Sequence, residues 1–349
     1  LLVAGITMFY TFFGGFMGAS YTDMVQGLLM LAALIAVPIV AITNMGGLDH
    51  VTDAVANVRP DALGLFAGTT FIGIASALAW GLGYFGQPHI IVRFMALRTP
   101  EDAKAGRRIG MSWMLLTVVG SISTAFVGVA YFATHPEVSL TDKESAETVF
   151  LDLAQILFHP FIAGMILAAV LAAIMSTLSS QLVVCSSALV EDLYGVFVKK
   201  KLSSNQSLWL GRAGVAIVAV IATLMALDKN NSILSLVEFA WAGFGSAFGP
   251  IVILSLYWRK LTLPGAVSGM VVGAVVTFFW RQVFNLTETI DVYEMIPGFF
   301  LAFLVTVVVS LSTYQKNDKI EQEFEEAANL AKLTTAGLPA KEEEQAAKA

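Results

Sequence analysis

An uncharged, apolar stretch of the chain carries an unusual run of residues near its midpoint. Residues 79–89 read Ala-Trp-Gly-Leu-Gly-Tyr-Phe-Gly-Gln-Pro-His, and the three glycines and the proline weaken a helix and free backbone carbonyls and amides. Trp80, Tyr84 and Pro88 recur every fourth residue, which would place them on one slowly drifting face of a helix. Trp80 lies too near the midpoint of the stretch for an aromatic belt residue, so we favour a segment that lines a solute site over a belt residue followed by a proline kink.

A second group of polar residues lies in the apolar run that begins at Pro160. On a helix, Ala173, Ser176, Thr177 and Ser180 fall within about 100° of one another. Hydroxyls on one face would suit a hard monovalent cation that prefers oxygen ligands. Serine and threonine in membrane helices also bond to the carbonyl one turn earlier or join two helices. Spacing alone leaves both readings equally open.

Two acidic residues carry weaker signals. Asp23 lies at the entrance of an apolar segment, where a carboxylate also complements the helix dipole. Glu238 lies about two turns inside its segment, which indicates a vestibule-facing or snorkelling carboxylate rather than a ligand. No carboxylate pair, histidine cluster or activated nucleophile is found at depth, so the sequence predicts a protein that is not an enzyme.

Composition indicates that these residues lie in a membrane. The 349 residues are 57% hydrophobic and only 13% charged, and the mean hydropathy is +0.76, far from an ordinary soluble chain. The net charge of −6 argues against nucleic-acid binding. The single cysteine, Cys185, excludes a disulfide framework and a cysteine-rich metal site.

Uncharged segments predict an all-α membrane protein with nine crossings, because none alternates as a barrel strand would. Leu1–Phe13 resembles the end of a helix whose beginning is missing, and a turn at Gly14–Asp23 would follow it. The eight other predicted crossings are Met24–Leu48, Ala62–Val92, Ile109–Pro136, Leu153–Val190, Leu208–Leu227, Phe239–Trp258, Leu261–Trp280 and Met295–Gln315.

Loop charges predict the orientation of these crossings. Basic residues gather in alternate loops, at Arg93–Arg108, Lys199–Lys201 and Arg259–Lys260, while the loop at residues 137–147 and the other intervening loops are mainly acidic. The positive-inside rule then places the basic loops and the C-terminus in the cytoplasm. The sequence therefore predicts a transmembrane domain over residues 1–314 and a charged, solvated cytoplasmic tail over residues 315–349.

Four motifs in the same order resemble the sodium:solute symporter family. They are residues 14–26 (Gly-Gly-Phe-Met-Gly-Ala-Ser-Tyr-Thr-Asp-Met-Val-Gln), 79–96, 175–194 and 240–250 (Ala-Trp-Ala-Gly-Phe-Gly-Ser-Ala-Phe-Gly-Pro). The resemblance implies the leucine-transporter-like bundle, with two inverted five-helix repeats and flanking helices. It also implies a fragment that lacks the N-terminal third of the family's length.

The same resemblance implies roles for individual residues. Trp80, Tyr84 and Pro88 would contact L-proline. The carbonyl of Ala173 and the hydroxyls of Ser176 and Thr177 would bind Na⁺, which favours the cation reading of that group. Asp23 would lie near the ion path. Na⁺ would be the coupling ion, and no organic cofactor is implied.

The function implied by the resemblance is uptake of L-proline, driven by inward Na⁺ movement across a bacterial plasma (inner) membrane. Another small solute carried by the same family is the nearest alternative, and a membrane-embedded enzyme or a channel is a remote one. The expected partners are L-proline, Na⁺ and the lipid bilayer, with no nucleic acid. The number of subunits stays open.

Overall fold

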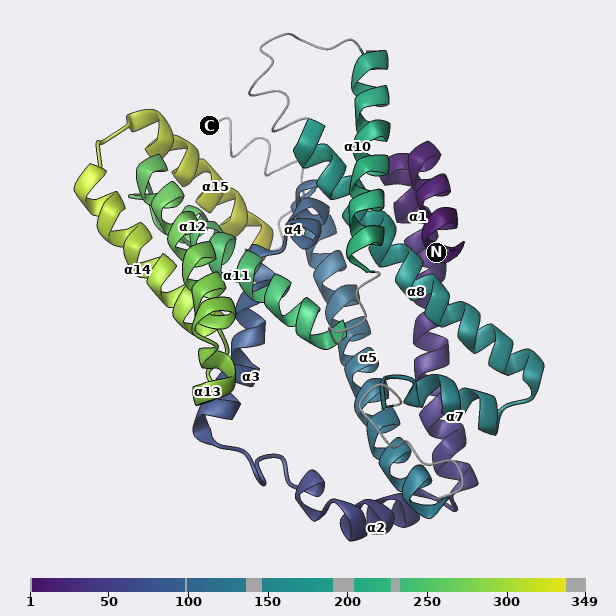
Figure 1. Cartoon of the computed structure of the whole chain (residues 1–349). Coiled ribbons are helices and arrows are strands. Elements are labelled where there is room, and N and C mark those ends of the chain that lie inside the picture. Colours follow the sequence, from purple (N-terminus) through teal and green to yellow (C-terminus); the bar gives the residue numbers. More distant parts are fainter. Residues whose placement is uncertain (1, 98, 136–145, 191–203, 227–232, 337–349) are drawn as a thin grey trace. The chain divides into compact units, whose positions relative to one another are not determined.

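The computed structural model describes residues 2–97, 99–135, 146–190, 204–226 and 233–336, and within these ranges the regular structure is helical (Figure 1). The chain divides into two compact units. One comprises residues 1–67 and 109–230, and the other comprises residues 68–108 and 231–349. The predicted basic loop at 199–201 and most of the predicted acidic loop at 137–147 lie outside the described residues.

The first unit is a bundle of long helices. Its core is made mainly of small and aliphatic side chains such as Val37, Val55, Val127 and Leu153, all almost fully buried. The helices are α1 (Leu2–Asn44), α2 (Leu48–Val58), α5 (Pro100–Thr134, in this unit from Ile109 on), α7 (Val149–Leu157), α8 (Pro160–Ser187) and α10 (Ser204–Met225), with a short 3₁₀ turn η1 at Pro60–Leu63.

Helix α1 corrects one prediction. We expected a partial helix, a turn at Gly14–Asp23 and then a separate crossing, whereas α1 is continuous from Leu2 to Asn44. The glycines at 14, 15 and 18 lower helix propensity by about 1 kcal/mol each, but they keep their backbone N–H groups. Proline would remove that donor, and the only proline inside α1 is Pro38.

The second unit combines two segments that are far apart in sequence. The first contains α3 (Phe71–Gly83), the 3₁₀ turn η2 (Tyr84–Gly86) and α4 (Pro88–Met95). The second contains α11 (Ile233–Tyr257), α12 (Leu263–Phe278), the π-helical turn η5 (Phe279–Val283), α13 (Leu286–Ile290), α14 (Met295–Thr313) and α15 (Asp318–Ala336). Ala79 of α3, Ala242 of α11 and Phe299 of α14 share one buried cluster, so these three helices pack together.

Helices α12 and α14 lie side by side through a stripe of small residues (Figure 1). Gly265 and Gly269 of α12 are buried, and a Cβ atom on either glycine would collide with Ser310 or Thr306 of α14. Membrane helices associate through such close contact, because lipid provides no hydrophobic drive between them.

Seven helices are long and apolar enough to cross a membrane, among the residues that the structure describes. They are Tyr21–Asn44, Asp102–Thr134, Pro160–Val190, Asn205–Met225, Leu234–Tyr257, Leu263–Val283 and Met295–Thr313, and the shorter apolar Phe71–Gly86 corresponds to an eighth predicted crossing. The described part of the ninth predicted crossing, residues 2–13, is the first part of α1.

Part of the charged tail forms helix α15. Glu325 of α15 forms an ion pair with Arg259 and accepts a hydrogen bond from its guanidinium over 3.1 Å. The same guanidinium lies 5.5 Å from the centre of the Phe324 ring. The helix therefore contacts the turn between α11 and α12. Residues 337–349 of the predicted tail lie outside the described residues.

Candidate functional site

The predicted solute segment is a broken helix. Thr70 caps α3 by accepting a 2.9 Å hydrogen bond from the Gly73 amide, and α3 continues through Trp80 to Gly83. A 3₁₀ turn starts at Tyr84, and α4 starts only at Pro88. The glycines and the proline therefore interrupt the helix, as the sequence predicts.

The break changes the expected placement of one residue. Trp80 and Tyr84 remain one helical turn apart because Gly83 and Tyr84 keep helical dihedrals. Gln87 is extended, with φ −84° and ψ 112°, as the residue before a proline tends to be. The single face predicted for all three residues thus does not extend to Pro88.

Helix α11 covers the break at very short range. A Cβ atom on Gly83 would collide with the Trp241 ring, and one on Gly86 would collide with the carbonyl of Phe244. Gln87, only 3% exposed, donates from Nε2 to the Trp241 carbonyl over 3.2 Å. Glycine is needed at 83 because the Trp241 ring lies so close, and at 86 because the α11 backbone does.

Aromatic rings gather beside the break. Trp241 donates from Nε1 to the Trp80 carbonyl over 3.0 Å, and its ring packs edge-on against Tyr84 with 4.9 Å between centroids. Trp80 also stacks on Tyr293, with centroids 5.8 Å apart and ring planes 15° apart. Tyr84 remains 43% exposed. The group can therefore present an aromatic surface next to backbone that is not part of a regular helix.

Sequence reasoning missed two members of this aromatic group. Trp241 belongs to the motif at residues 240–250, which we used for the resemblance without giving it a role. Tyr293 carried no signal, because it precedes the last crossing in a loop that looked merely acidic.

The predicted cation-binding residues lie in the first unit, on α8. The Ser176 hydroxyl donates to the Ala173 carbonyl over 3.1 Å, so two of the predicted oxygens are adjacent. Ser179, fully buried, donates in turn to the Ser176 carbonyl over 3.0 Å. The Thr177 side chain is exposed. Ser176 thus makes a hydrogen bond within its own helix, as serines in membrane helices commonly do. The carbonyl that accepts this bond is the one predicted to bind the cation.

Asp23 of α1 joins this region. The Ser180 hydroxyl donates to Asp23 Oδ2 over 3.3 Å, and both side chains are half-buried. The sequence analysis placed Ser180 in the set of polar residues on this helix and described Asp23 as a separate feature. The structure places the Asp23 carboxylate on Ser180, which lies one helical turn from Ser176 on α8.

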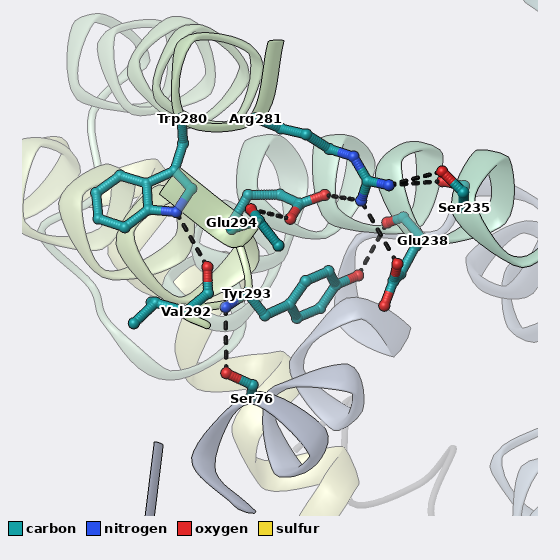
Figure 2. Close-up of polar contacts among 9 residues, drawn as sticks. Ser76, Ser235, Glu238, Trp280, Arg281, Val292, Tyr293 and Glu294 are labelled. Atoms are coloured by element: carbon teal, nitrogen blue, oxygen red, sulfur yellow. Dashed lines mark hydrogen bonds and ion pairs between the residues drawn. The ribbon is translucent and has the colours of Figure 1, made fainter. Parts of the chain in front are cut away.

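A third polar group lies in the second unit, around Arg281 (Figure 2). Its guanidinium is 2.7 Å from Glu294 Oε1 and 3.5 Å from Glu238 Oε2, and it donates to the Ser235 hydroxyl over 2.8 Å. Glu294 is completely buried. Glu238, which the sequence predicted to face a vestibule or to snorkel, is a member of this ion-paired cluster.

Tyr293 connects the ion cluster to the aromatic group. Its hydroxyl donates to the Glu238 carbonyl over 2.9 Å. Burial, together with the negative charges of Glu294 and Glu238, raises the pKa of Tyr293, so the phenol keeps its proton and stays a donor at physiological pH.

Comparison with known proteins gives these groups a context. The model of the sodium:solute symporter family matches residues 1–273. The chain belongs to this family. It is 47% identical to the high-affinity proline transporter PutP of Bacillus subtilis, over 93% of this chain and 67% of that protein.

Two further relatives support the family assignment. Identity is 49% with the osmoregulated proline transporter OpuE of Bacillus subtilis, over 89% of this chain and 62% of that protein. It is 44% with the sodium/proline symporter of Escherichia coli, over 93% and 64%. The chain thus spans about two thirds of the length of these relatives. The family and these relatives are transporters. The helices that are long and apolar enough to cross a membrane, taken together with the bacterial symporter relatives, make this chain a multi-pass plasma-membrane protein.

A solved structure confirms the fold. The chain superposes on a substrate-bound, outward-open, Na⁺-coupled sialic acid symporter with a TM-score of 0.70, over 90% of this chain and 66% of that one. Identity is only 18%, so this likeness concerns the fold alone. The predicted leucine-transporter-like helical bundle is therefore correct.

Proposed function

We propose that the protein takes up L-proline by coupling it to inward movement of Na⁺. The observation that carries this proposal is the interrupted helix at Tyr84–Gln87 with aromatic rings beside it, in a chain 44–49% identical to proline transporters. A compact, apolar pyrrolidine ring suits flat aromatic faces, and backbone amides released by the break suit a carboxylate.

In this proposal, Trp80, Tyr84 and Pro88 contact proline. Tyr84 is the most accessible aromatic ring of the group, since it is 43% exposed and Trp80 packs on two other rings. Trp241 holds the site in shape, because its indole N–H bonds to the Trp80 carbonyl and its own carbonyl accepts from Gln87.

Na⁺ is bound by the Ala173 carbonyl and by the hydroxyls of Ser176 and Thr177, with Asp23 near the ion path. Hydroxyl and carbonyl oxygens suit a hard cation, and a nearby carboxylate compensates its charge. Binding of either ligand raises the affinity for the other by the same factor. The membrane potential adds about 2.3 kcal/mol per charge per 100 mV to uptake.

The proposed domain organisation follows the sequence. Residues 1–314 form the transporter domain and residues 315–349 a cytoplasmic tail. The contact of α15 with Arg259 supports the same side for the tail and the basic α11–α12 turn.

Counterflow tests this function. The protein, expressed at its full natural length in a bacterial strain without proline transporters, is reconstituted into vesicles preloaded with unlabelled proline. Labelled proline should accumulate transiently, and Na⁺ should be required. A carrier exchanges in this way and a channel does not. If a different preloaded solute drives counterflow and proline does not, that solute and not proline is the substrate.

A further inference from the structure

The loop before α14 is fastened to two neighbouring segments by three successive residues. The Asp291 carbonyl accepts a hydrogen bond from the Ser76 hydroxyl over 3.2 Å, and the Ser76 hydroxyl oxygen accepts in turn from the Tyr293 amide over 3.1 Å. The Val292 carbonyl between them accepts from Trp280 Nε1 over 3.0 Å (Figure 2). Asp291 itself has a left-handed backbone, with φ 56°. Such a conformation in a non-glycine residue persists where surrounding contacts impose it.

Tyr293 lies against α3 at two successive turns. Its amide bonds to Ser76, and its ring stacks on Trp80, which follows Ser76 by four residues. The side chain is only 4% exposed, and its hydroxyl is fixed on the Glu238 carbonyl of α11. The ring therefore has little freedom to move, and it limits how the Trp80 indole can tilt.

The ion cluster holds the next residue of the same loop. Glu294 is fully buried, and it accepts from Arg281 and, over 2.9 Å, from the Thr287 hydroxyl. Arg281 reaches from there to Ser235 and Glu238 of α11. Charge-assisted hydrogen bonds away from water are strong and directional. The cluster thus fixes the backbone on which Tyr293 stands.

We propose that Tyr293 is a positioning residue for the solute site, which sets the orientation of Trp80 and thereby the preference of the transporter among ring sizes of cyclic amino acids. This inference rests on the proposed function of Trp80. Tyr293 acts through Trp80 and does not contact the solute. The residues proposed for Na⁺ lie in the other unit, so a change at Tyr293 alters solute preference and leaves the Na⁺ concentration for half-maximal uptake unchanged at saturating solute.

The experiment compares two substitutions of Tyr293 in the full-length protein in vesicles. Uptake of labelled proline is measured against competing imino acids with a four-membered or a six-membered ring. Tyr293→Leu removes the stacked ring and should raise the KM for proline about three- to tenfold, the size of an aromatic pair. It should also reduce the preference for proline over both competitors. Tyr293→Phe keeps the ring and should retain the preference.

The matched control is Tyr257→Leu, because Tyr257 is 81% exposed at the end of α11 and touches neither cluster. The proposal is overturned if Tyr293→Leu leaves the preference unchanged, or if Tyr257→Leu changes it equally. Should Tyr293→Leu fail to reach the membrane, Ser76→Ala removes the hydroxyl that links the loop to α3 and must shift the preference in the same direction; an unchanged preference overturns the proposal. Absence of Na⁺-dependent proline counterflow by the wild type overturns the proposed function instead, and the same comparison is then made among analogues of the solute that is carried.

Discussion

The Ser180 hydroxyl donates a hydrogen bond to Asp23 across 157 residues of sequence and joins α8 to α1. Ser176 lies one turn away on the same helix, with its hydroxyl on the Ala173 carbonyl. A carboxylate, two hydroxyls and a carbonyl thereby occupy one short stretch of the α1–α8 contact. In the proposed Na⁺ site, this grouping supplies both oxygen ligands and compensation of the ion's charge.

Asp23→Asn should raise the Na⁺ concentration for half-maximal proline uptake by about tenfold. The amide keeps the shape of the side chain but loses a charge that contributes on the order of 1–4 kcal/mol to a cation a few ångströms away. Ser180→Ala removes the hydrogen-bond donor, keeps the charge, and should have a smaller effect. The measurement is proline uptake as a function of Na⁺ concentration. Equal Na⁺ dependence in Asp23→Asn and the wild type would contradict a role for Asp23 near the ion path.

The double substitution of Ser176 and Thr177 by alanine should abolish Na⁺ stimulation of proline uptake. Both hydroxyls are proposed ligands, and an alanine methyl group offers no oxygen. The control is Ser186→Ala in the same helix, because Ser186 is buried and donates to the Gly211 carbonyl of α10. Proline uptake with and without Na⁺ is the measurement. If the double variant is still stimulated by Na⁺, other residues bind the cation.

Tyr84→Ala and Trp80→Ala should raise the KM for proline more than they change the Na⁺ dependence. Each removes an aromatic face, and large-to-small changes at packed rings cost about 3–5 kcal/mol when fully buried. Tyr84 is half-exposed, so its loss should affect binding more than folding. Trp113→Ala, on α5 of the other unit, is the control. If neither variant alters the preference for proline over other amino acids, the solute is bound elsewhere.

Two glycines in the same segment should respond in opposite ways to alanine. At Gly86 a Cβ atom would collide with the Phe244 carbonyl, whereas at Gly81 there is open space. Gly86→Ala should therefore lower the free energy of unfolding by about 1–3 kcal/mol and impair uptake. Gly81→Ala should gain up to about 1 kcal/mol from helix propensity. Melting curves of the purified variants in the same lipid make the comparison. A Gly86→Ala variant as stable as the wild type would contradict the close approach at Gly86.

Removal of Arg281 should be far more harmful than removal of its whole ion pair. Arg281→Met leaves the fully buried Glu294 without its cation, which typically costs about 3–5 kcal/mol. Adding Glu294→Gln to Arg281→Met removes the uncompensated charge and should recover part of that loss. A double-mutant cycle on thermal stability gives the coupling between the two side chains. Additive effects of the two substitutions would mean that the pair contributes nothing as a pair.

Local sequence predicted the parts of the site that depend on local backbone chemistry. Glycines and Pro88 predicted the interruption of α3 because glycine lowers helix propensity and proline lacks an N–H. The hydroxyls of Ser176 and Thr177 could be assigned to one helix segment from spacing. The resemblance of the motifs to the family then favoured cation binding as the role of that segment.

Contacts between distant segments could not be predicted in this way. Trp241 reaches Trp80 across 161 residues, and Ser76 bonds the Tyr293 amide across 217. Nothing in the residues around Tyr293 indicates that its ring stacks on α3, since that depends on how α14 packs. The single helix α1 was missed because a turn was expected at Gly14–Asp23, where the helix continues instead.

The glycine stripe between α12 and α14 has a consequence for how stability varies with temperature. Lipid tails already shield the apolar surface of both helices, so parting them inside the bilayer transfers little of it to water. Exposure of apolar surface to water is what produces the large heat capacity of unfolding and weakens soluble cores on cooling. The contact of Gly265 and Gly269 with Ser310 and Thr306 depends on shape and dispersion instead. The free energy of association of this helix pair should therefore change little on cooling. A soluble core that buries the same apolar area from water would become less stable.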